Sequence, residues 1–250
     1  MAVSIKSARE IELMREAGKR LAHVHQELEA MITPGISTWE IDAKGEKLIR
    51  DCGCIPNFLH YNGYPASICV SVNDEVVHGI PRKDRYLKEG DIVSLDAGLI
   101  YKGYHSDAAR THAVGKVSTE AQKLMDVTKQ SFFEGIKMAK EGQHLHDISR
   151  AIEEYVAPYG YGIVRDLVGH GIGTALHEDP QIPNYAQKRR GVRLQAGMTL
   201  AIEPMINAGT WQVRFLRDGW TVVTKDGSLS AHYENTILVT DGEPEILTLY

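Results

Sequence analysis

The chain has 250 residues, 43% of them hydrophobic and 24% charged, which is typical of a folded protein with a sizeable core. A net charge of −5 argues against a sequence-specific nucleic-acid surface, and no apolar run approaches the roughly 18 residues of a membrane helix. Without a signal-peptide pattern, and with three cysteines (Cys52, Cys54 and Cys69) that lack framework spacing, we expect a cytoplasmic protein without membrane association.

Two pairs of helices are predicted in chain order. Ser7 and Glu10 form a capping-box pattern that starts the first helix, and the Thr-Pro-Gly at 33–35 ends it. A second helix starts near Ser37 and stops at Gly53. The same arrangement returns later, with one helix predicted over 119–140 and another over 147–159.

The second half of the sequence can be laid on the first with a constant offset of 107 residues. Gly35 then falls on Gly142, and residues 87–96 fall on 194–203, so that Asp96 lies on Glu203. Neither half is expected to bury its sheet face alone. The repeat therefore predicts one α+β domain over residues 1–250, with pseudo-symmetric halves of about 1–115 and 116–250.

A hairpin is predicted for residues 90–107, because Tyr-Lys-Gly at 101–103 is a turn signal between two apolar segments. Centring the turn between Tyr101 and Lys102 places Asp96 directly opposite Asp107, roughly 5 Å apart at Cβ. Two opposed carboxylates destabilise a sheet unless a cation or a proton lies between them. A divalent metal, a shared proton, or a Lys or Arg from elsewhere would each satisfy this requirement.

Other ionisable residues occur in apolar or glycine-rich surroundings. They are His78 in VVHGIP, His170 and His177 in VGHGIGTALHEDP, Glu203 in TLAIEPM and Glu234 in SAHYENTILVT. Their neighbours Glu178, Asp179 and His232 are interpreted as bystanders. A set of two Asp, two Glu and one His suits a carboxylate-bridged pair of divalent ions such as manganese, iron(II), cobalt or zinc. Such a pair polarises a carbonyl and supplies hydroxide near neutral pH.

The chain resembles the type I methionine aminopeptidases of peptidase family M24 in five segments. These are SVNDEVVHGIP, SLDAGLIYKGYHSDAARTH, VGHGIGTALHEDP, TLAIEPMINAG and SAHYENTILVT. The resemblance implies the pita-bread fold, in which two pseudo-symmetric αα-β halves surround a curved antiparallel sheet with helices on its outer face. It also implies removal of the initiator methionine from nascent proteins whose second residue is small.

The resemblance also implies residue roles. Asp96 would bind the first metal, His170 and Glu203 the second, and Asp107 and Glu234 would bridge both. Glu203 would be the general base, while His78 and His177 would contact the substrate. The methionine pocket would be lined by Phe58, Tyr61, Tyr64, Cys69, Leu176 and Trp220. A monovalent-cation site near Asn73 and Ser230 is a further feature of the family.

Two other functions fit part of the pattern. An X-Pro aminopeptidase or prolidase would share the fold and metal ligands, but such enzymes usually carry a large preceding domain. A non-catalytic relative would usually have lost metal ligands, and none is missing here. Only 32 residues separate His170 from Glu203, which favours type I over type II enzymes. The resemblance further implies a monomer and is compatible with transient ribosome association.

Overall fold

The computed structural model describes residues 3–249. Its helices are α1 (Ala8–Glu29), α2 (Thr38–Asp51), η1 (Tyr61–Gly63), α3 (Thr119–Ile136), α4 (Leu145–Val156) and η2 (Ala157–Tyr159). Its strands are β1 (Ile55–Pro56), β2 (Ile68–Val72), β3 (Glu75–Val77), β4 (Ile92–Tyr101), β5 (Tyr104–Ala113), β6 (Gly162–Ile163), β7 (Gly169–Gly171), β8 (Glu178–Ile182), β9 (Thr199–Ile202), β10 (Met205–Asn207), β11 (Val213–Phe215), β12 (Val222–Thr224), β13 (Ser230–His232), β14 (Asn235–Leu238) and β15 (Glu245–Ile246).

The helix starts follow from local capping. In α1 the Ser7 side chain accepts from the Glu10 N–H while the Glu10 carboxylate accepts from the Ser7 N–H, and Ser37 and Glu40 do the same at α2. The predicted end of the third helix is wrong, because α3 stops at Ile136 rather than continuing to residue 140. Lys140 instead forms an isolated β-bridge with Thr240, and this pairing is incompatible with a helical backbone at residue 140.

The predicted repeat is visible in backbone contacts that recur with the same offset. The Gly35 N–H donates to the Leu87 carbonyl at 2.8 Å, and the Gly142 N–H donates to the Leu194 carbonyl at 3.0 Å. Both glycines have positive φ, 95° and 87°, which a residue with a Cβ adopts only with strain. The two halves therefore use the same glycine turn between their paired helices, α1 and α2 in the first half and α3 and α4 in the second.

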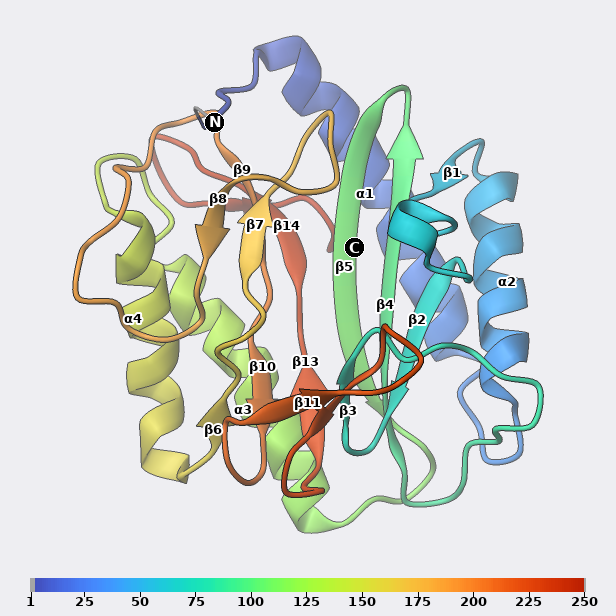
Figure 1. Ribbon diagram of the computed structural model, residues 1–250. Helices are drawn as coiled ribbons and strands as arrows, with labels where there is room; N and C mark the ends of the chain where they lie inside the picture. The colour runs from blue at the N-terminus through green and yellow to red at the C-terminus, as the bar shows by residue number, and fades with distance from the viewer. Residues whose placement is uncertain (1–2, 250) are drawn as a thin grey trace.

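The described residues form four antiparallel sheets, and a helix pair covers the largest sheet of each half (Figure 1). In the first half β4 pairs with β1, β2 and β5, and in the second the order is β15-β14-β9-β7-β8. Separate apolar cores lie beneath α1 and α2 and beneath α3 and α4. The halves meet at the inner strands, where the Glu234 N–H donates to the Ala109 carbonyl at 2.9 Å and the Ala109 N–H donates back at 3.3 Å.

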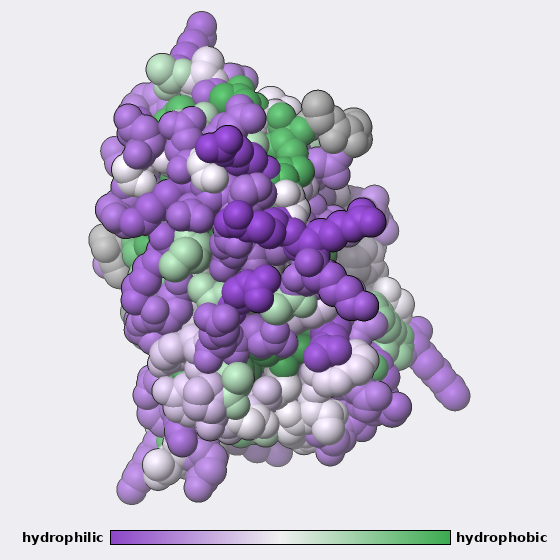
Figure 2. All heavy atoms as spheres, turned by 90° about the vertical axis from the view of Figure 1, so that its left-hand side faces the viewer, coloured by the Kyte–Doolittle hydropathy of each residue, from purple (hydrophilic) through white to green (hydrophobic). Residues whose placement is uncertain are grey.

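The outer surface over α4 is mainly hydrophilic, with hydrophobic atoms in small scattered areas (Figure 2). Among residues 3–249, no helix combines the length and apolar character that a membrane crossing requires.

Candidate active site

A cavity of about 220 Å³ lies where the two halves meet. All the predicted metal-binding, catalytic and substrate-binding residues line it, together with Asn62. They are Phe58, Tyr61, Tyr64, Cys69, His78, Asp96, Asp107, His170, Leu176, His177, Glu203, Trp220 and Glu234. The lining therefore combines four acids and three histidines with an aromatic and apolar wall.

Asp96 and Asp107 share a face of the first sheet, but the predicted register is wrong by two residues. Asp107 lies opposite Gly98, and Asp96 lies opposite Ala109. The reason is the turn, where Lys102 and Gly103 both take positive φ, so that the tight loop falls one residue later than the pattern predicts. Because side chains alternate along a strand, a two-residue shift keeps both carboxylates on one face as diagonal neighbours.

Burial and mutual repulsion favour protonation of the four acids. Burial raises the pKa of Asp96 to about 7, and it raises the pKa of Glu203 well above its ordinary value. Burial also raises the pKa values of Asp107 and Glu234, with further contributions from the other carboxylates. Four ionised carboxylates in one buried cavity need a compensating positive charge. No Lys or Arg lies among the described residues that line it.

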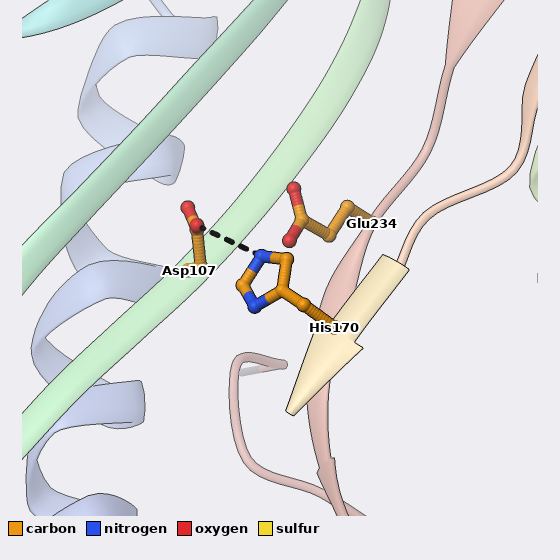
Figure 3. A group of neighbouring side chains, drawn as sticks. All are labelled: Asp107, His170 and Glu234. Atoms are coloured by element: carbon orange, nitrogen blue, oxygen red, sulfur yellow. Dashed lines mark ion pairs between the residues drawn. The ribbon is translucent and has the colours of Figure 1, made fainter. Parts of the chain in front are cut away.

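His170 faces Asp107 and Glu234 from β7 (Figure 3). Its Nδ1 lies 2.8 Å from the Gly171 carbonyl oxygen. Because a carbonyl oxygen can only accept a hydrogen bond, Nδ1 carries the ring proton and donates it there. Its Nε2 then carries a lone pair and lies 3.9 Å from Asp107 Oδ2 and 3.7 Å from Glu203 Oε1. An imidazole whose second nitrogen donates to a carbonyl is the usual arrangement of a metal ligand.

The residues present fit a divalent metal centre. One ligand atom each from Asp107, His170 and Glu234 lies within 4.8 Å of the others. One buried carboxylate oxygen each of Asp96, Asp107 and Glu234 has no hydrogen-bond partner among the described residues. An oxygen-rich donor set with one imidazole suits manganese, iron(II), cobalt or zinc. Asp96 and Asp107 also form a hydrogen bond with each other, which requires a proton between the two carboxyl groups. A bound metal ion would take the place of that proton.

Aromatic side chains form the wall beside this polar floor. Tyr64 and Trp220 meet edge to face with ring centroids 5.1 Å apart, and His78 meets Trp220 in the same way at 6.3 Å. His78 has φ 58°, an unusual backbone conformation for a residue with a Cβ. Burial lowers the pKa of His78 to about 4, so the ring is neutral at pH 7. The rings of His177 and His170 meet edge to face, with their centroids 4.3 Å apart.

His232 is closer to the site than predicted. The interpretation of this residue as a bystander is wrong, because its Nε2 lies 3.6 Å from Glu203 Oε2 and 3.9 Å from Glu234 Oε2. The sequence does contain one indication of this position. His232 and Glu234 are two residues apart, and residues two apart in an extended chain share a face. Glu178, by contrast, is not part of the cavity lining and holds Lys6 through an ion pair of 2.7 Å.

Asn62 is the lining residue that the sequence did not predict. It has φ 49° and stands between Tyr61 and Gly63 in the short helix η1. The Asn-Gly pair at 62–63 predicts a turn, and a turn pattern does not indicate whether the asparagine side chain lines a pocket.

A larger cavity of about 360 Å³ lies between α1, β5 and α3. Its lining includes His25, Arg110, His112, Lys129 and His232 but none of the predicted metal ligands. The smaller cavity is therefore the one that carries the acid cluster.

A model of metallopeptidase family M24 matches residues 12–241. The chain is 54% identical to the methionine aminopeptidase of Clostridium acetobutylicum over 247 residues, 99% of each chain. It is 51% identical to methionine aminopeptidase 1 of Bacillus subtilis, with 97% of this chain and 98% of the other covered.

The solved methionine aminopeptidase of Thermotoga maritima superposes with a TM-score of 0.97 at 46% identity, covering 100% of both chains. The X-Pro aminopeptidase of the same organism superposes with a TM-score of 0.77 at 22% identity, and this chain covers 62% of it. These superpositions confirm the predicted pita-bread fold. The second indicates shared architecture alone, because its sequence identity is low.

Proposed function

Because this chain belongs to metallopeptidase family M24, we propose that it is a methionyl aminopeptidase that removes the initiator methionine from nascent proteins with a small second residue. The observation that carries the proposal is the cavity of about 220 Å³ at the junction of the halves. It joins an acid cluster suited to two divalent ions with an aromatic wall suited to an unbranched thioether side chain.

The metal-binding roles of individual residues are part of the proposal. Asp96 would hold the first ion, His170 and Glu203 would hold the second, and Asp107 and Glu234 would be shared by both. The cross-strand position of Asp107 and the backbone pairing of Glu234 with Ala109 support bridging, because both carboxylates lie at the junction of the halves. A bound pair of such ions supplies Lewis acidity and a nucleophilic water near neutral pH.

The remaining chemistry is assigned to this chain's own side chains. Glu203 accepts the proton of the attacking water as the new C–O bond forms, and it delivers that proton to the departing amine as the C–N bond breaks. His177 donates a hydrogen bond at the scissile amide, and His78 contacts the substrate. Burial lowers the pKa of both imidazoles, which keeps them neutral.

The methionine side chain is proposed to occupy the wall beside the metal ligands. Its lining residues are Phe58, Tyr61, Tyr64, Cys69, Leu176 and Trp220. Phe58, Tyr64, Cys69 and Leu176 are buried and pack in one apolar cluster, so the pocket has fixed walls. A β-branched or charged side chain would clash with these walls or be desolvated without a partner.

A monovalent cation is proposed near Asn73 and Ser230. The Ser230 N–H donates to the Asn73 carbonyl at 2.9 Å, and Asn73 has φ 58°, so two loops meet there in a constrained conformation.

The bound divalent ions are proposed to be manganese, iron(II), cobalt or zinc. The protein is proposed to act in the cytoplasm as a monomer, with transient ribosome association.

A panel of Met-X-Ala-Ser peptides, assayed with each metal, tests the proposal. We expect release of methionine when X is Ala, Gly or Ser and poor turnover when X is Leu or Lys. Norleucine should replace methionine, whereas N-terminal Leu, Val and Lys should be poor substrates. Preferential cleavage of X-Pro peptides would indicate the alternative, a prolidase-like enzyme, and metal binding without any cleavage would indicate a non-catalytic relative.

A further inference from the structure

A tyrosine hydroxyl contacts the histidine that is proposed to act at the scissile amide. Tyr61 Oη lies 2.8 Å from His177 Nδ1, and the two rings are 5.4 Å apart between centroids. Tyr61 belongs to the short helix η1, which is preceded by His60 at φ 67° and contains Asn62 at φ 49°. The hydroxyl is thus presented to the imidazole by a loop of unusual backbone conformation.

The direction of this hydrogen bond decides which nitrogen of His177 carries the proton. A phenol is a much stronger acid than a neutral imidazole, so the O–H donating to a bare ring nitrogen is the stronger of the two possible bonds. When Nδ1 accepts from Tyr61, the ring proton must lie on Nε2. His177 can then donate only through Nε2.

From this geometry we infer that Tyr61 is a positioning residue, which fixes His177 as the Nε2–H tautomer and orients it for the substrate amide. The inference rests on the proposed function of His177 and adds a role for Tyr61 beyond lining the methionine pocket. The mechanism resembles that of a triad in which a third group holds a histidine in its working tautomer.

Tyr61→Phe removes the hydroxyl and keeps the ring, so it separates the two roles of Tyr61. We expect kcat to fall roughly three- to tenfold, the range that one neutral hydrogen bond supports, while KM for a Met-Ala-Ser peptide changes little. In the His177→Ala background the same substitution should have no further effect on kcat, because the two residues act as one unit.

Tyr64→Phe is the matched control. Tyr64 lines the same pocket, but its hydroxyl donates to the Gly79 carbonyl at 2.9 Å rather than to a histidine. Its effect should lie mainly in KM and should be additive with His177→Ala.

The tautomer can be observed directly in zinc-loaded, ¹⁵N-histidine-labelled protein, with the His177 signals assigned by their loss in His177→Ala. We expect the Nε2–H form in the wild type and a mixture of tautomers in Tyr61→Phe. An unchanged tautomer together with full additivity between Tyr61→Phe and His177→Ala would overturn the inference. Failure of the wild type to cleave Met-Ala-Ser peptides would instead reject the proposed function, and the tautomer measurement would still decide the role of Tyr61.

Discussion

The two halves have the same scaffold but contribute different groups to the cavity. The glycines that follow α2 and η2, Gly53 and Gly160, have φ values of 72° and 73°. At the centre, however, Cys69 lies opposite Asp96 in the first half, whereas β7 brings His170 beside β9 and Glu203 in the second. The first half thus provides most of the proposed methionine pocket, and the second provides the imidazole that faces the acids. A repeated scaffold can therefore hold an asymmetric reaction centre.

The strongest test of this asymmetry compares Asp96 with Glu203, which occupy equivalent positions. Glu203→Gln should lower kcat by about 10²–10⁴-fold even at saturating metal, because it removes the proposed general base. Asp96→Asn should mainly weaken metal binding, so that excess metal restores part of the activity. Steady-state kinetics across a metal titration distinguish the two, and equal rescue of both variants would contradict the assignment of the base.

The two histidines of the second half should also differ. His177→Ala should lower kcat by about 10²–10³-fold, the usual cost of one transition-state donor, and should leave KM and metal stoichiometry nearly unchanged. His170→Ala should lose activity by weakening metal binding, with partial rescue by excess metal. A His177→Ala protein that lost an ion, beside a His170→Ala protein that kept both, would reverse these roles.

Metal removal should make stability depend on pH through the acids that both halves contribute. In the folded metal-free protein the pKa of Asp96 rises to about 7, and those of Asp107, Glu203 and Glu234 rise well above their ordinary values. Because the folded pKa values exceed the unfolded ones, the stability contribution of these acids is present at low pH and is lost as pH rises through the folded values.

Thermal unfolding of chelator-treated protein should therefore show a Tm that falls between pH 5 and pH 8, and the gap to the metal-loaded protein should widen. The metal-loaded protein is the control, since its carboxylates are held ionised. A gap that stays constant or narrows across this range would argue against four coupled acids.

The smallest effects should come from the shared scaffold. Gly53→Ala and Gly160→Ala each force a Cβ into the left-handed region and should lower the free energy of unfolding by about 1–2 kcal/mol. Nothing lies within 4 Å of a Cβ built at either position, so the cost should be conformational and similar in the two halves. Urea denaturation of both variants measures it, and a large difference would show that the repeat is not energetically equivalent.

The helix starts and the residues that line the cavity were predicted correctly, whereas the hairpin register, the place of His232 and the contribution of Asn62 were not. The capping boxes at Ser7 and Ser37 identified helix starts, because both partners lie within one turn. The hairpin register was missed because Lys102 takes a left-handed conformation that its residue type does not favour. His232 was missed because its contact with Glu203 joins separate segments of the second half, and Asn62 because a turn signal dominated its surroundings.

Metal stoichiometry in wild-type, Asp107→Asn and Asp96→Asn proteins, measured by titration calorimetry, tests the central claim most directly. If Asp107 and Glu234 bridge two ions at the junction of the halves, the wild type should bind two ions. Asp107→Asn should then weaken both sites, while Asp96→Asn should weaken one. An Asp107→Asn protein that binds two ions as tightly as the wild type would contradict the bridged centre.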